Sequence, residues 1–121
     1  MWAMGFASLG QNVKINDKAA IYSAEQMQIS DHGWIDDFCV VSARLAIGRN
    51  LHVAPFCLQA GAVQGTTLED FAGLADRVSV FAQSDDYSGA KMTHPAVPAR
   101  HRAARCAVVR IGRHSLVGAG A

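Results

Sequence analysis

The chain has 121 residues, half of them hydrophobic, and its 11 basic and 10 acidic residues leave a formal net charge of +1. This length fits one domain, and the balanced charge argues against nucleic acid or an anionic membrane surface as the partner. No apolar run is long enough to span a membrane, and the first residues lack the basic segment of a signal peptide. We therefore predict a cytoplasmic protein.

Residues 1–12 form a predicted lead-in, after which a six-residue repeat organises the chain. In its clearest stretch an Ile or Val recurs at every sixth position, and a small or acidic residue follows each one: Ile29, Ile35, Val41, Ile47 and Val53. A period of six matches neither a helix nor a simple strand and is typical of a parallel β-helix, in which three hexads form one triangular coil. The interior of such a prism is filled by Ile, Val and Leu, so any site lies outside it.

Two short insertions interrupt the repeat, within residues 25–28 and 59–67, and residues 68–85 form another predicted coil. Residues 86–104 hold one glycine and two prolines and break the pattern, so we predict a loop excursion there. The repeat then returns and stops within a hexad. We expect a single domain over residues 1–121, with roughly six coils by this repeat count, an incomplete last coil, and truncation from a longer chain.

Polar residues fill the predicted turns, where Asp and Asn tolerate left-handed backbone angles: Asp31, Asp37, Asn50, Asp70 and Asp76. Cys39 and Cys57 lie one coil apart and should stack in neighbouring coils. Side chains stacked in register point the same way, and cytosolic thiols stay reduced, so we predict two packed free thiols.

Three stretches resemble the hexapeptide-repeat acyltransferases, and among them the bacterial sugar O-acetyltransferases of surface-polysaccharide synthesis: residues 35–39, 68–71, and 84–89 followed by 92–98. The resemblance implies an all-β fold, a single-stranded left-handed parallel β-helix, and homotrimers with active sites between subunits. It also implies acetyl-CoA as co-substrate, no metal, and transfer of acetyl to a hydroxyl of a sugar or nucleotide sugar. Family members carry further coils that form much of the groove for the pantetheine arm, so we expect weak acetyl-CoA binding by this chain.

His52 is the leading candidate for the base that accepts the hydroxyl proton, because imidazole titrates near neutral pH. The repeat puts it at a corner, with Trp34 one coil below and Gly73 one coil above. An aromatic wall and an open glycine suit a cleft, so Trp34 and Gly73 are predicted to contact substrate. The resemblance places the matching corner in an acceptor site; the alternative is a solvated histidine.

Asp85 and Asp86 stand where the excursion begins. Galactoside-type relatives carry a catalytic histidine near Asp85, and this chain has a carboxylate, so that role does not transfer. Asp85 is predicted to orient His52 across a subunit interface or to bind sugar hydroxyls. Alternatively, Asp85 or Asp86 is itself the base, or the two carboxylates only cap the turn. Tyr87 and Ser88 are predicted to contact substrate, Tyr87 by stacking on a sugar ring.

The excursion also holds basic residues that could bind phosphates of coenzyme A or a nucleotide sugar, or simply be solvated: Lys91, His94, Arg100, His101, Arg102 and Arg105. His32 and His114 are interpreted as turn residues. Zinc chemistry would need three converging histidines, which the repeat does not favour. A sugar N-acetyltransferase and an inactive β-helical binding or structural protein remain the alternative functions.

Overall fold

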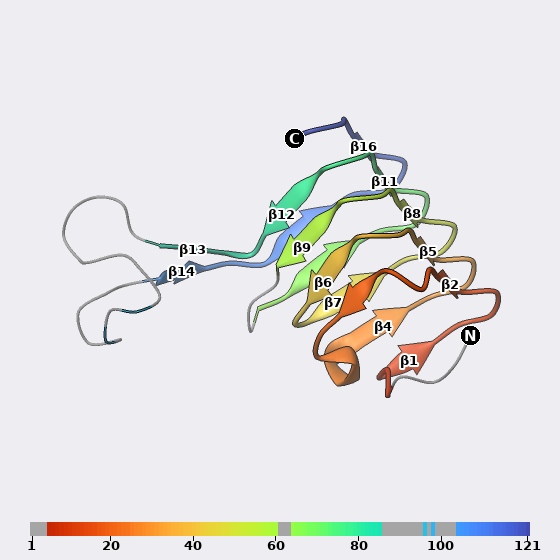
Figure 1. Ribbon diagram of the computed structural model, residues 1–121. Helices are drawn as coiled ribbons and strands as arrows, with labels where there is room; N and C mark the ends of the chain where they lie inside the picture. The colour runs from red at the N-terminus through yellow and green to blue at the C-terminus, as the bar shows by residue number, and fades with distance from the viewer. Residues whose placement is uncertain (1–4, 61–63, 86–95, 97, 99–103) are drawn as a thin grey trace.

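The computed structural model describes residues 5–60, 64–85, 96, 98 and 104–121, and these form a triangular β-solenoid (Figure 1). Each coil gives one short strand to each of three parallel sheets. Sheet A contains β1 (Ser8–Leu9), β4 (Met27–Ile29), β7 (Leu45–Ile47), β10 (Thr66–Leu68) and β15 (Val109–Ile111). Sheet B contains β2 (Lys14–Ile15), β5 (Trp34–Ile35), β8 (His52–Val53), β11 (Gly73–Leu74) and β16 (Leu116–Val117). Sheet C contains β3 (Ala20–Ile21), β6 (Val40–Ser42), β9 (Leu58–Ala60) and β12 (Ser79–Phe81).

The strand register confirms the repeat and both insertions. Gln28 pairs with Ala46, a step of 18 residues, whereas Ser8 to Gln28 is 20 and Ala46 to Thr67 is 21. The first insertion is taken up by a 3₁₀ turn, η1 (Ala24–Gln26), and the second lies just before β10. In the described residues the strands make four complete coils and two sides of a fifth, fewer than the six predicted, because the excursion takes up the residues of a further coil.

The predicted inward residues form the core. Ile29, Ile35 and Val41 are 1% exposed, Ile47 2% and Val53 3%. Each is stacked on the equivalent residue of the next coil through the parallel ladder. Full burial of one such side chain contributes about 1.5–3 kcal/mol, so these ladders supply most of the stability of the prism.

The prediction that turn aspartates adopt left-handed angles is wrong for Asp31, Asp37, Asp70 and Asp76. The left-handed residue is the one that follows each of them: His32, Phe38, Phe71 and Arg77, with φ from 60° to 61°. Three of these carboxylates instead accept backbone N–H groups of the coil below: Asp31 from Gln11 and Asp70 from Arg49, each at 2.7 Å, and Asp37 from Lys18 at 3.3 Å. Asn50 does adopt the predicted angle, with φ of 53°.

Cys39 and Cys57 are free and buried, as predicted. Their Sγ atoms donate to the carbonyl oxygens of Ala54 and Ala75, each at 3.1 Å. Burial raises the pKa of the Cys39 thiol to about 11 and also raises the pKa of Cys57. Both thiols are therefore packing groups rather than nucleophiles.

The chain leaves the prism earlier than predicted. β12 ends at Phe81, and β13 (Gln83–Asp85) pairs antiparallel with β14 (Ala104–Cys106) in a ribbon that projects from the solenoid (Figure 1). Residues 68–85 are therefore not one regular coil, because their last strand pairs outside the prism. Among the described residues, no helix is long and apolar enough to cross a membrane.

Candidate functional site

A column of outward side chains crosses sheet B, formed by residues that pair in register: Lys14, Trp34, His52, Gly73 and Leu116. Strands of a sheet lie about 4.8 Å apart, which is close to the spacing of stacked rings. The Trp34 and His52 rings are accordingly stacked, with centroids 4.2 Å apart and planes inclined by 26°. The Lys14 ammonium lies 4.7 Å from the centre of the Trp34 ring. Trp34 and Gly73 thus flank His52 in the order that the repeat predicts.

Asp36 is the hydrogen-bonding partner of His52. Its Oδ2 lies 3.3 Å from His52 Nε2, and its Oδ1 accepts from the Asn16 side chain and the Asp37 backbone, each at 2.8 Å. The Asp37 N–H is the main cause that lowers the pKa of Asp36; burial opposes it, and His52 and Asn16 lower it further. Asp36 is therefore ionised at neutral pH and can only accept.

This arrangement sets the roles of the two imidazole nitrogens. Because Asp36 accepts, neutral His52 carries its hydrogen on Nε2 and keeps a lone pair on Nδ1. One ring face is covered by Trp34, and the His52 side chain remains 42% exposed while that of Asp36 is 18% exposed. An imidazole that is fixed in orientation and exposed to solvent can take a proton from a substrate, and the neighbouring carboxylate stabilises the imidazolium that forms.

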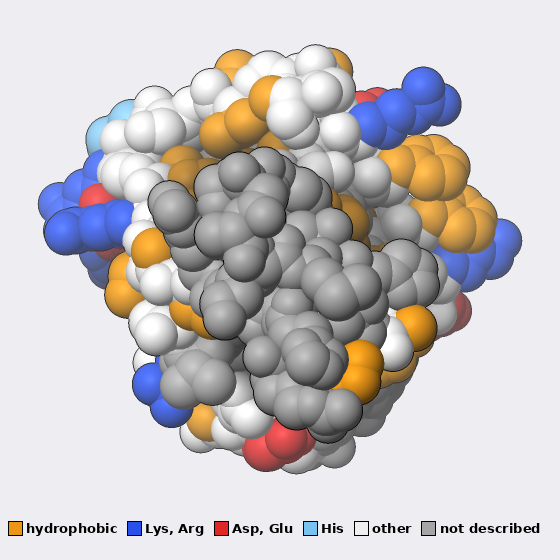
Figure 2. Space-filling model, turned by 90° about the vertical axis from the view of Figure 1, so that its left-hand side faces the viewer, with side chains coloured by type: hydrophobic (Ala, Val, Ile, Leu, Met, Phe, Trp, Pro, Cys, Tyr) orange, Lys and Arg blue, Asp and Glu red, His pale blue; other side chains and the backbone are white. Residues whose placement is uncertain are grey.

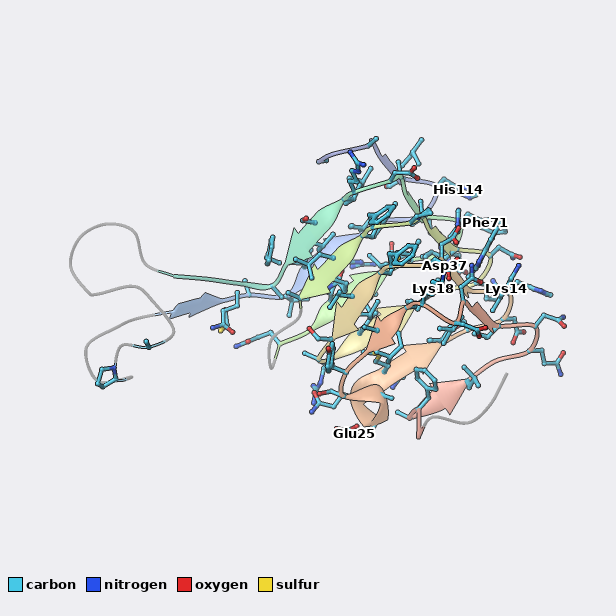
Figure 3. The ribbon with its side chains drawn as sticks, in the orientation of Figure 1. Lys14, Lys18, Glu25, Asp37, Phe71 and His114 are labelled. Carbon is cyan, nitrogen blue, oxygen red and sulfur yellow. The ribbon has the colours of Figure 1, made fainter. Side chains whose placement is uncertain are left out.

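Asp36, Asn16 and Lys14 were not among the site residues predicted from the sequence. A signal for Asp36 was available: in the stretch from Ile29 to Val53, the other residues that follow the apolar hexad positions are small, namely Ser30, Ser42, Gly48 and Ala54. Figure 3 shows Lys14 beside Lys18 and Asp37, well away from Glu25 at η1. The His52 site therefore lies on a different part of the prism from η1.

The other predicted site residues fall on or near the ribbon. Asp85 belongs to β13, where its backbone pairs with Ala104, and Arg105 belongs to β14. The remaining predicted residues of the excursion lie outside the described residues: Asp86, Tyr87, Ser88, Lys91, His94, Arg100, His101 and Arg102. Their predicted roles, and that of Asp85, stay predictions.

His32 and His114 are turn residues, as predicted. Both adopt left-handed backbone angles, with φ of 61° and 57°. The His114 ring stacks on Phe71 with centroids 5.1 Å apart, and Figure 3 shows the two side chains together. Within the described part of the chain, no group of three or more His, Cys, Asp or Glu residues could hold a metal ion.

Hollows in the surface of the described residues lie over sheet A and beside Lys14. One of about 460 Å³ covers the outer side of sheet A around Gln28, Arg44 and Ala46, and one of about 360 Å³ lies beside Lys14 and Asn16. Neither hollow is lined by His52 or Asp36, although Asn16, which donates to Asp36, lines the second. We place the candidate site at sheet B, where the histidine–carboxylate pair lies.

No protein-family model matches the chain. A dTDP-4-amino-4,6-dideoxy-D-glucose acyltransferase from Escherichia coli is 38% identical over 120 residues, which make up 97% of this chain and 62% of that protein. AntD, an N-acyltransferase from Bacillus cereus solved with dTDP and 3-hydroxybutyryl-CoA, is 34% identical with a TM-score of 0.93, over 97% of this chain and 62% of AntD. A single-site AntD variant, solved with dTDP-4-amino-4,6-dideoxyglucose and coenzyme A, matches equally well. The chain thus spans less than two thirds of the length of these proteins. The similarity in sequence and fold confirms the predicted resemblance to hexapeptide-repeat acyltransferases.

Proposed function

Because the chain resembles the hexapeptide-repeat acyltransferases in both fold and sequence, we propose that it transfers an acyl group from acyl-CoA to the amine of a nucleotide-linked amino sugar. The observation that carries the proposal is the His52–Asp36 pair on the exposed side of sheet B. The E. coli relative is named for a 4-amino-4,6-dideoxy sugar, and AntD is an N-acyltransferase. An amine acceptor therefore replaces the hydroxyl acceptor of the sequence-based prediction.

In this proposal His52 acts as the general base. The acceptor amine attacks the thioester carbonyl, a C–N bond forms, and His52 Nδ1 takes the proton that the nitrogen loses. Collapse of the tetrahedral intermediate breaks the C–S bond, and the departing thiolate takes a proton from the imidazolium to leave as coenzyme A. The amine has lost one proton and the thiol has gained one, so His52 returns to its starting state.

Asp36 is a positioning residue in this mechanism. It holds Nε2–H through Oδ2, while Asn16 and the Asp37 backbone fix its other oxygen. This fixes the nitrogen that faces the substrate and stabilises the imidazolium that forms. Trp34 stacks on one face of the His52 ring and limits rotation of the imidazole.

The donor is an acyl-CoA, with acetyl as the group implied by the resemblance and 3-hydroxybutyryl as the group in the AntD complex. Nucleotide sugars and acyl-CoA are both found in the cytoplasm, the location predicted from the sequence. We also expect the homotrimer that the resemblance implies.

The outer side of sheet C supports self-association, because its large apolar side chains are exposed: Tyr22, Val40 and Phe81. Beside it, the Phe38 and Phe56 rings stack at 5.2 Å with Lys18 and Arg77 against their outer faces. Figure 2 shows hydrophobic side chains gathered beside Lys and Arg side chains at one edge of the molecule. Light scattering of the purified chain tests the trimer.

The test of the proposed function compares two acceptors with each of the two acyl-CoA donors. We expect mass spectrometry to detect an N-acylated product from dTDP-4-amino-4,6-dideoxyglucose and none from dTDP-glucose, which offers only hydroxyls. The exposed Cys106 would react with a thiol reagent, so the product is measured rather than released thiol. A chimera that adds to this chain the part of the E. coli acyltransferase outside the matched region controls for weak acyl-CoA binding. Acylation of dTDP-glucose at an equal rate, or no product from either form, would refute the proposal.

A further inference from the structure

Gln59 and Thr66 place polar groups inside the prism, at positions that are apolar in neighbouring coils. Gln59 is paired in register with Val41 of the coil below and with Val80 of the coil above. Thr66 is paired in the same way with Leu45 of the coil below. Both Gln59 and Thr66 are only 2% exposed, so their side chains point into the core rather than toward solvent.

The two residues lie on either side of one corner of the prism. Gln59 belongs to β9 of sheet C, and Thr66 begins β10 of sheet A. In the coil below, the equivalent positions are held by Val41 and Leu45, which belong to the same cluster of buried hydrophobic residues. The side chains of Gln59 and Thr66 therefore face the same part of the interior.

Within the part of the chain that the structure describes, these two side chains have no hydrogen-bonding partner. The atoms concerned are Nε2 and Oε1 of Gln59 and Oγ1 of Thr66, and all three are buried. A buried donor or acceptor that stays unpaired destabilises a fold, and native proteins keep such groups rare. An amide unpaired at both ends, beside an unpaired hydroxyl, therefore indicates a bound polar molecule that is small enough for the core.

The chemistry of the two side chains matches water. The Gln59 amide offers one group that donates and one that accepts, and the Thr66 hydroxyl can do either. A water molecule also donates and accepts, so it can bridge the amide and the hydroxyl, as buried waters with two to four polar partners do. An ion is disfavoured, because neither side chain carries a charge to offset the cost of burying one. We propose that Gln59 and Thr66 bind a single buried water molecule inside the prism, at the corner between sheets C and A.

The site also lies close to solvent. Thr66 lines the hollow of about 460 Å³ over sheet A together with Gly65 and Arg44, although its hydroxyl is buried. Gly65 adds no side chain to this wall, and with φ of 84° it adopts a conformation that other residues rarely take. The backbone around Gly65 thus separates the buried hydroxyl from bulk water, and a local opening there lets the bound water exchange. The water takes no part in the proposed chemistry, because it lies inside the prism and His52 lies on the outside.

Urea unfolding of variants distinguishes a hydrated pair from a dry one. Thr66→Val removes the hydroxyl and nearly keeps the shape of the side chain. It should lower the urea midpoint by about 0.5 M, because the water and the Gln59 amide lose a partner. The double variant Gln59→Leu with Thr66→Val should recover the midpoint of the parent or exceed it, because it leaves no polar group unpaired and restores an apolar pair like Val41 and Leu45.

Thr67→Val is the matched control, since Thr67 is the next residue of β10 and is not buried. It should change the midpoint by less than about 0.2 M, because its hydroxyl is open to solvent in both states. A midpoint that rises in Thr66→Val would mean that the hydroxyl is unpaired and dry, and would overturn the proposal.

A second measurement uses the parent chain alone and needs no variant to fold. Rotating-frame nuclear Overhauser spectroscopy separates direct transfer between water and protein protons from proton exchange. We expect direct transfer between water and the side-chain amide protons of Gln59, because a bound water would lie within hydrogen-bonding distance of Nε2. If these amide protons show no transfer from water, the interior at Gln59 holds no water and the proposal is wrong.

Discussion

Ile47→Ala should destabilise the solenoid by about 3–4 kcal/mol. Ile47 is 2% exposed and stacks between Ile29 and Leu68 of the neighbouring coils. The substitution removes three buried carbon groups, worth about 2.4 kcal/mol at about 0.8 kcal/mol each. Ile29 and Leu68 are held in place by the backbone ladder and can collapse only partly into the space, so a cavity term adds to the transfer term.

Urea unfolding followed by far-ultraviolet circular dichroism measures the free energy of unfolding. Ile47→Val should cost about 0.5–1.5 kcal/mol, because it removes one carbon and leaves a smaller cavity. Val108→Ala, at a position 62% exposed, should change the free energy by less than about 0.5 kcal/mol. If Ile47→Ala costs less than about 1 kcal/mol, or no more than Val108→Ala, then Ile47 is not part of a packed ladder and the solenoid core is wrongly assigned.

Three further predictions concern titrating groups. Asp36→Asn should lower kcat by less than His52→Ala does, and the two losses should not add in the double variant; additive losses would mean that the residues act independently. Of the three thiols, only Cys106 should react quickly with a thiol reagent in the native protein, and rapid reaction of Cys39 would contradict its burial and its pKa of about 11. The N–H and side chain of Arg49 lower the pKa of Asp70 in the folded protein, so this carboxylate stabilises the fold above its ordinary pKa of 3.8, and the contribution is lost as pH falls through the lowered value. Asp70→Asn should therefore flatten the fall in the urea midpoint below about pH 4, and an unchanged slope would exclude Asp70 as a source of that fall.

The six-residue repeat predicts well whether a side chain points into or out of the prism. It predicts poorly which side chains of neighbouring coils touch when they are not aligned in register. A six-residue period fixes which way each side chain points, so Ile29, Val41 and Ile47 could be assigned to the core from the sequence. The same count, with the insertions included, aligns Trp34 and Gly73 with His52.

Asp36 aligns with Ala54 rather than with His52, so its hydrogen bond to His52 runs diagonally between coils and depends on side-chain geometry that a repeat count does not contain. The departure of the chain at Gln83 depends on pairing with Ala104–Cys106, a distant segment that continues no hexad.

Transfer of the acyl group to the amine by a His52-dependent step is the central claim. Rapid-quench measurement of amide formation from dTDP-4-amino-4,6-dideoxyglucose and 3-hydroxybutyryl-CoA, with parent and His52→Ala in the chimera described above, tests it most directly. We expect an amide product and a rate that falls by about 10²–10⁴ in His52→Ala, with acyl-CoA affinity unchanged. Equal rates for the two proteins over the same pH range would contradict it and remove His52 from the chemistry.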